Sequence, residues 1–397
     1  MRGKRRKGQS SPFHVEGWHP AIVAAAGAGS FLAVTLVVLV VLLSATGSPV
    51  EPSWALPVIA TSIGAGGAAG LTIKNLNLKR AESRRGTNLM FDSQFETGAR
   101  LLGGESEPEI VAGSLLLGSL LRESSRHSQA CADLICAALR EVRSPDLPPD
   151  VYETLVASGD EAFAERLGVL NRKRNAIAGA IHRALARDGA PQHLRGIRWE
   201  FSGLTFGDGT DLSGALFGEG TTFIRCHFGG EGRLRGVEFA SRCTFEFVTA
   251  RDGIDLSGAI ADAGLGFYDS SLGTARKPTV VGLWLEQARI AGLDVRDVAS
   301  QGGFNADDSV INGDFRILDS AFRTVSYIDA RGASRVDLGH VTAEDFICLR
   351  GFESRKGVCL AGCKAGGELE VTGVRTDGRV VIDDCKYGEL IEGERRA

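Results

Sequence analysis

The chain has 397 residues, more than one domain normally needs, and a formal net charge of −4 at pH 7. Residues 201–397 contain 30 Asp or Glu and 22 Lys or Arg, a net charge of −8, and no basic patch interleaved with aromatic residues. This composition argues against direct binding of nucleic acid through that half of the protein.

The N-terminal part has the charge pattern of a membrane hairpin. Residues 1–20 are basic, and residues 21–73 hold two apolar runs separated by a short loop that contains no Lys or Arg. Positive residues resume directly after the second run, so the pattern places both termini in the cytoplasm and residues 21–73 in the lipid of the inner membrane. A secretory signal peptide is the alternative, but the first apolar run is long for one and no small-x-small cleavage site follows it.

The second apolar run is rich in Gly and Ala. Gly66 and Gly70 have the four-residue spacing that allows close contact between helices, which predicts self-association through this segment. Residues 64–69 also match a dinucleotide-binding glycine pattern, but they lie in an uncharged span without a strand–turn–helix context, so helix packing is the better interpretation.

Residues 74–190 are expected to be mainly α-helical. Ser106 and Glu109 have the spacing of a capping box, and three prolines mark a linker at residues 144–150. A further helical pattern starts after residues 158–161, which form a second capping box, and ends near Gly189. We expect this last segment to cap the open end of the region that follows, because exposed ladder ends invite strand addition.

The region that follows is a strict repeat. Two sets of mostly large apolar residues recur every eleven positions and are offset by five. The first set is Phe201, Leu212, Phe223, Leu234, Phe245, Leu256 and Phe267, and the second is Phe206, Phe217, Phe228, Phe239, Ala250, Ala261 and Leu272. Gly often stands two places after such a residue, where a corner would strain a side chain. This period predicts short strands that stack into a ladder.

The repeat resembles the pentapeptide-repeat family, with DLSGALF at 211–217 and IDLSGA at 254–259 as the closest matches. The stretch 95–140 is similar to the helical segment of bacterial, membrane-anchored members of that family. The resemblance implies a right-handed parallel β-solenoid of about 22 residues per coil over residues 194–397, preceded by the transmembrane hairpin and the helical region. An antiparallel β-sandwich is the alternative, but hairpins rarely keep one exact period.

The period breaks near 273–282 and then resumes. Val295, Ala306, Ile317 and Ile328 are eleven apart, and after a one-residue deletion the series continues from Leu338. A second series runs beside it: Ile347, Val358, Leu369, Val380 and Ile391. We therefore expect one continuous solenoid of about eight coils, about 40 Å long.

Chemistry-bearing motifs are scarce. Cys359 and Cys363 have a C-x-x-x-C spacing without further metal ligands nearby. His227 is expected to point outward. In the pairs Asp307–Asp308 and Asp383–Asp384, the two residues point to opposite faces of a strand, which argues against paired acid–base catalysis. The eight cysteines fit a reducing compartment, with several as small core residues. We identify no catalytic, cofactor-binding or metal-binding residues and expect no cofactor.

The sequence favours a non-enzymatic, membrane-tethered cytoplasmic scaffold whose solenoid surface binds an unknown protein partner. The net charge of −8 keeps open a second interpretation, a DNA mimic that modulates a topoisomerase such as gyrase. An enzyme is a third interpretation. Some parallel β-helices are polysaccharide lyases, but the clustered carboxylates or basic residues that such sites need are not visible in the pattern.

Overall fold

The computed structural model describes residues 86–104, 106–142, 161–273 and 281–392, together with Lys79, Glu82 and Ser83. The protein divides into two compact units, residues 1–90 and 91–397. The predicted membrane hairpin at 21–73, with Gly66 and Gly70, and the linker at 144–150 lie outside the described residues. Within the described residues, no helix is both long enough and apolar enough to cross a membrane.

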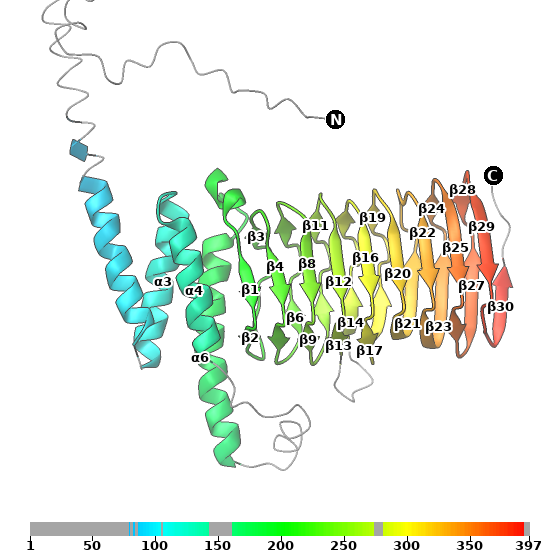
Figure 1. Cartoon of the computed structure of the whole chain (residues 1–397), viewed down its shortest axis with the longest axis horizontal. Coiled ribbons are helices and arrows are strands. Elements are labelled where there is room, and N and C mark those ends of the chain that lie inside the picture. The colour runs from blue at the N-terminus through cyan, green and yellow to red at the C-terminus, as the bar shows by residue number, and fades with distance from the viewer. Residues whose placement is uncertain are drawn as a thin grey trace, which may run out of the picture. The chain divides into compact units, whose positions relative to one another are not determined.

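In the described part of the second unit, four α-helical segments and one short 3₁₀ helix precede the strands (Figure 1). Residues 91–102 are helical, and the named elements are α3 (Glu107–Glu123), α4 (Ser128–Glu141), α6 (Glu161–Leu185) and η1 (Gln192–Gly196). The capping box at the start of α3 is confirmed, because Ser106 and Glu109 bond reciprocally. Gly113 lets the first helix approach α3 closely, since a Cβ there would lie 2.4 Å from the backbone nitrogen of Leu102.

The strands form a parallel β-solenoid with about 22 residues per coil, as the repeat predicts (Figure 1). Among the described residues, every paired strand is parallel, which excludes the antiparallel sandwich. One side of the solenoid is a nine-stranded sheet of β1 (Glu200–Ser202), β4 (Thr222–Ile224), β8 (Cys243–Glu246), β12 (Leu265–Tyr268), β16 (Leu293–Arg296), β20 (Phe315–Leu318), β22 (Val336–Gly339), β25 (Gly357–Ala361) and β29 (Arg379–Asp383).

The other sides are built from shorter strands. In the later coils, the long strands β21 and β23 each cover the positions of two separate strands of an earlier coil. Two sides of the solenoid therefore join into one fourteen-stranded sheet. Its strands are β2 (Thr205–Phe206), β5 (His227–Phe228), β6 (Gly232–Arg233), β9 (Thr249–Ala250), β10 (Ile254–Asp255), β13 (Ser271–Leu272), β14 (Val281–Trp284), β17 (Ala299–Ser300), β18 (Gly303–Asn305), β21 (Ala321–Ile328), β23 (Thr342–Arg350), β26 (Lys364–Ala365), β27 (Glu368–Thr372) and β30 (Glu389–Glu392). The remaining strands are β3 (Leu216–Phe217), β7 (Glu238–Phe239), β11 (Ile260–Ala261), β15 (Arg289–Ile290) and β19 (Val310–Ile311) in one sheet, and β24 (Glu353–Ser354) and β28 (Arg375–Thr376) in another.

The core is the stack of inward residues that the repeat identified. All fourteen residues of the two sets at 201–272 are buried. The ring of Phe223 stacks on that of Phe245 with centroids 4.6 Å apart and lies 4.8 Å from Phe201, one coil away on each side. Parallel strands about 4.8 Å apart bring side chains at equivalent positions of successive coils into contact. A large residue at the same position of each coil therefore forms a continuous column.

The register departs from the predicted series at two later positions. The series places Ile328 inside, but Tyr327 is the buried residue, and it pairs in register with Leu349. The cause is an irregular register between Phe322 and Thr324 of β21, which places the deletion before residue 327. Similarly, Leu390 and not Ile391 continues the buried column from Leu369.

The expected break near 273–282 is an insertion within one coil. Phe267 pairs with Val295, whereas Phe245 pairs with Phe267, so the later coil contains six more residues than its neighbour. The register between β14 and β18 shifts between Val281 and Leu283. The solenoid continues through this insertion without loss of the parallel pairing.

Helices α4 and α6 cover the first coil. Arg140 of α4 donates to the carbonyl oxygens of Ser202 and Glu200, and Asn175 of α6 donates to the carbonyl of Asp208. Trp199 stacks on Phe201 with centroids 5.5 Å apart and extends the aromatic column toward the helices. The capping segment expected from the sequence therefore includes α4 as well as α6.

Replacing Tyr327 by Phe is expected to stabilise the solenoid by about 1 kcal/mol, because the buried phenol oxygen has no hydrogen-bond partner among the described residues. Burial also raises the pKa of Tyr327, so the hydroxyl stays protonated. The measurement is the denaturant midpoint of unfolding. Tyr268→Phe is the matched control, since that hydroxyl has partners and its loss gives no such gain. A lower denaturant midpoint for Tyr327→Phe would show that the hydroxyl makes a stabilising contact after all.

Candidate functional site: a polar hollow on the nine-stranded sheet

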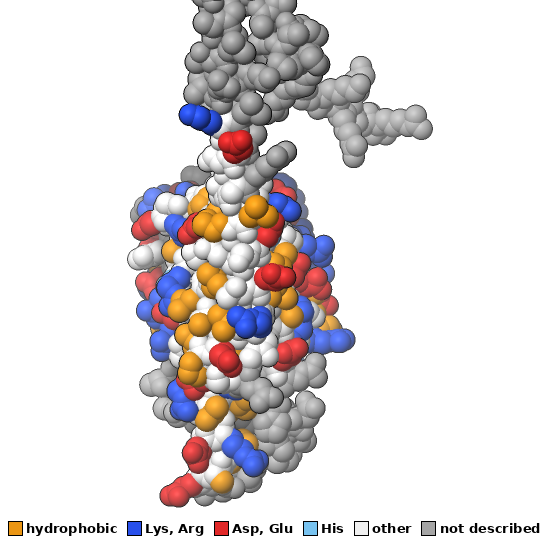
Figure 2. Space-filling model, turned by 90° about the vertical axis from the view of Figure 1, so that its left-hand side faces the viewer, with side chains coloured by type: hydrophobic (Ala, Val, Ile, Leu, Met, Phe, Trp, Pro, Cys, Tyr) orange, Lys and Arg blue, Asp and Glu red, His pale blue; other side chains and the backbone are white. Residues whose placement is uncertain are grey.

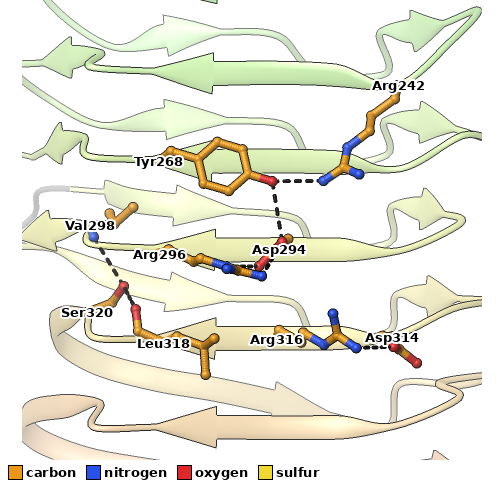
Figure 3. A network of polar contacts seen from close by, with 9 residues as sticks. All are labelled: Arg242, Tyr268, Asp294, Arg296, Val298, Asp314, Arg316, Leu318 and Ser320. Carbon is orange, nitrogen blue, oxygen red and sulfur yellow. Dashed lines mark hydrogen bonds and ion pairs between the residues drawn. The ribbon is translucent and has the colours of Figure 1, made fainter.

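A network of polar side chains lies on the outer face of β8, β12, β16 and β20 (Figure 3). Arg242, just before β8, donates to the Tyr268 hydroxyl over 2.8 Å, and that hydroxyl lies 3.3 Å from Asp294. Asp294 also accepts two hydrogen bonds from Arg296, at 2.8 and 3.0 Å. The network links three successive coils, because these residues belong to β8, β12 and β16 or to the corner before them.

Glycine at position 266 allows Tyr268 to take this position. A Cβ on Gly266 would lie 2.6 Å from the tyrosine ring, so the ring can lie along the sheet only over a residue without a side chain. The hydroxyl is thereby carried back toward Arg242 on the preceding coil (Figure 3).

Next to the network, the surface is hollowed to a volume of about 220 Å³. Arg242 lies at one wall and Asp314 with Arg316 at another, and Gly264 and Gly292 form part of the floor. The hollow exists because two consecutive coils carry Ala-Gly at the corner where their neighbours carry Arg242 and Asp314. Its floor is main chain that is already hydrogen-bonded, since both glycine carbonyls accept ladder bonds from the adjacent coil.

The charges around the hollow do not cancel completely. Arg296 is paired with Asp294 and Arg316 with Asp314, and the hydrogen bonds and charge of Asp294 raise the pKa of Arg296. Among the described residues Arg242 has no carboxylate within 4.0 Å, and its side chain is exposed. One guanidinium is therefore left to interact with a ligand.

The cysteine pair singled out from the sequence is not brought together as a metal site. Cys359 is half-buried on the outer face of β25, whereas Cys363 is buried beyond the next corner and donates to the carbonyl of Leu338. Burial raises the pKa of Cys363 to about 12, which keeps the thiol protonated. Within the described residues, no group of three or more His, Cys, Asp or Glu is arranged to hold a metal ion.

The two acidic pairs have structural roles. Asp307 accepts hydrogen bonds from the Ser326 hydroxyl and from the backbone of Ile328, both at 2.8 Å. Asp308 and Asp384 are corner residues with φ of 53° and 47°, a left-handed conformation that Asp tolerates better than most residues.

His227 faces outward as expected, but it is half-buried. Its Nδ1 lies 3.0 Å from the Thr249 hydroxyl, and burial, together with the charges of Arg174 and Arg251, lowers its pKa to about 4. The imidazole is therefore neutral near pH 7 and is held in the surface of the first coils.

A Ser–His–Asp row in the helical region was not foreseen from the sequence. Ser124 Oγ lies 3.0 Å from His127 Nδ1, and His127 Nε2 lies 2.7 Å from Asp92 Oδ1. A nucleophile has to reach its substrate, yet Ser124 is only 5% exposed and follows the last residue of α3. The row joins the α3–α4 turn to the helix at 91–102 and has a structural role.

The hollow was also missed by sequence reasoning. Its residues are outward-facing, and Gly266 lies beside Asp294 only because this coil is six residues longer than its neighbour. In the ladder, Thr244, Gly266, Asp294 and Arg316 form one outward row, but the step from Gly266 to Asp294 is 28 residues and not 22, so a fixed period does not connect them. Comparisons of this protein with protein-family models, with curated proteins and with solved structures found no match.

Proposed function

We propose that this protein is a non-enzymatic scaffold, tethered to the bacterial inner membrane by residues 21–73, whose solenoid surface binds a protein partner in the cytoplasm. The observation that carries the proposal is the solenoid itself. Among the described residues, parallel strand pairing joins each coil to the next, so the outer side chains keep fixed spacings. Repeat architectures of this kind offer extended, rigid binding surfaces.

The polar character of the surface supports a selective contact. On the nine-stranded sheet, Arg296 is paired with Asp294, Arg316 with Asp314 and Arg335 with Asp337, and the hollow at Arg242 lies beside the first two pairs. At the helical end, Figure 2 shows hydrophobic side chains interspersed with charged ones and not gathered into one patch. A partner that recognises shape and charge fits the solenoid face better than one that needs a large apolar surface.

The tether is tested by comparing the full-length protein with residues 91–397, which form a compact unit. After cross-linking in intact cells, we expect the partner to be recovered with the full-length protein and at least about tenfold less with residues 91–397, because anchoring raises the local concentration of the two proteins. The control joins 91–397 to an unrelated two-helix anchor and should restore recovery. Equal recovery without any anchor would contradict a tethered scaffold.

The net charge of −8 on residues 201–397 supports the second candidate, a DNA mimic acting on a topoisomerase. The same 91–397 protein, added to gyrase supercoiling reactions at low salt, separates the two functions, because mimicry needs only acidic surface and shape. We expect no inhibition at micromolar concentration. Strong inhibition that is lost on adding salt would favour the mimic over the scaffold.

A further inference from the structure

We propose that the hollow beside Arg242 is a recognition site for a single carboxylate group, supplied by an acidic side chain or by the C-terminus of the protein partner. The protein nature of the partner rests on the proposed function above. The carboxylate site does not, because it follows from the geometry and charge of the hollow itself.

The size of the hollow suits one side chain or the end of a polypeptide. Its volume of about 220 Å³ is below the range of about 300–1,000 Å³ that is usual for pockets holding whole small-molecule ligands or cofactors. The main-chain carbonyls of Gly264 and Gly292 are already used by the ladder, so the floor contributes shape and the selective contacts come from the walls.

The charge balance favours one negative charge. Two of the three arginines in and beside the hollow are paired with aspartates, whereas no carboxylate of the described residues is paired with the Arg242 guanidinium. A guanidinium forms two parallel hydrogen bonds with a carboxylate, which gives direction as well as charge. A phosphate dianion would bring a second negative charge close to Asp294 and Asp314, and like charges at this range oppose binding.

Tyr268 is the positioning residue of the site. By accepting a hydrogen bond from Arg242, its hydroxyl holds the arginine side chain beside the hollow (Figure 3). The hydroxyl is itself oriented toward Asp294 on the next coil. The guanidinium is thus partly ordered before a ligand arrives, which lowers the entropic cost of binding.

The site can be tested in the full-length protein by protection of arginines from phenylglyoxal, with modification of each arginine measured by peptide mass spectrometry. N-acetylglycine represents the C-terminus of a polypeptide, and the α-amide of N-acetylglutamate represents an acidic side chain. At about 20 mM, we expect at least one of them to slow modification of Arg242 by about threefold or more, as millimolar binding requires. Arg289, exposed on β15 and paired with Asp262, is the internal control and should not be protected.

The variant Ala291→Leu fills the hollow from a half-buried lining position and leaves Arg242 in place. It should abolish the protection while Arg242 still reacts with phenylglyoxal, whereas Tyr268→Phe should weaken it. Which of the two probes protects identifies the source of the carboxylate. The site is disproved if neither probe protects Arg242, if Arg289 is protected equally, or if inorganic phosphate protects as well as the carboxylates. Protection of Arg242 without any partner recovered from cells would support the site and contradict the scaffold.

Discussion

Replacing Phe223 by Ala is expected to destabilise the solenoid by about 3–5 kcal/mol, the usual cost of removing a buried aromatic ring. The ring is fully buried, stacks on Phe245 in the next coil, contacts the tilted ring of Phe201 in the preceding coil, and meets Phe217 edge-on with centroids 6.0 Å apart. Its loss leaves a cavity that those neighbours cannot fill, since each is fixed by its own strand. Phe223→Asp, which buries a charge without a partner, is expected to prevent folding of these coils.

The effect is measured by denaturant unfolding of residues 91–397. Phe247→Ala is the matched control, because Phe247 lies on the same coil as Phe245 but is 45% exposed, so we expect a change below about 0.5 kcal/mol. A repeat protein can unfold in parts, so the signal should be followed at more than one wavelength. An unchanged midpoint for Phe223→Ala would show that the register of the aromatic column is wrong.

The sequence predicted the fold best at the positions where each coil places one side chain in the narrow core. In a parallel solenoid the same position recurs at a fixed interval, so Phe201, Phe223, Phe245 and Phe267 identify both the fold and the register. The same logic failed at Ile328, because Tyr327 beside it is also apolar and the apolar pattern alone cannot locate a one-residue deletion. Only the pairing of Tyr327 with Leu349 shows on which side of the deletion the register resumes.

The polar hollow was beyond this kind of prediction for a different physical reason. Outward positions carry no packing constraint, so they show no period, and the contact between Arg242 and Tyr268 joins residues from different coils. Gly266 gave one local hint, since glycine inside a strand often marks a close approach of another group. That the approaching group is the ring of Tyr268, two residues along the same strand, follows only from the structure.

Gly218→Ala is expected to destabilise the junction between the helical region and the first coil. A Cβ at this position would lie 2.1 Å from the carbonyl oxygen of Ile197 and 2.6 Å from that of Leu194, so backbone at the end of η1 would have to move. Backbone cannot yield as a flexible side chain does, and we expect a loss of about 3 kcal/mol. This loss of stability should affect the helical cap, because η1 contacts β3 where the helical region meets the first coil.

Hydrogen exchange gives the local readout for this variant. In Gly218→Ala, amides of η1 and of the strands β1 and β3 are expected to exchange faster, while those of β20 and β25 keep their protection, since stability in stacked repeats depends mainly on neighbouring coils. Gly196→Ala is the control in η1, because its added Cβ would have no other contact within 4 Å in the part of the chain that the structure describes. If the amides of η1 are equally protected from exchange in Gly218→Ala and Gly196→Ala, the position of η1 does not depend on its close contact with Gly218. Faster exchange at β1 alone, with η1 unchanged, would mean that the first coil and not the cap gives way.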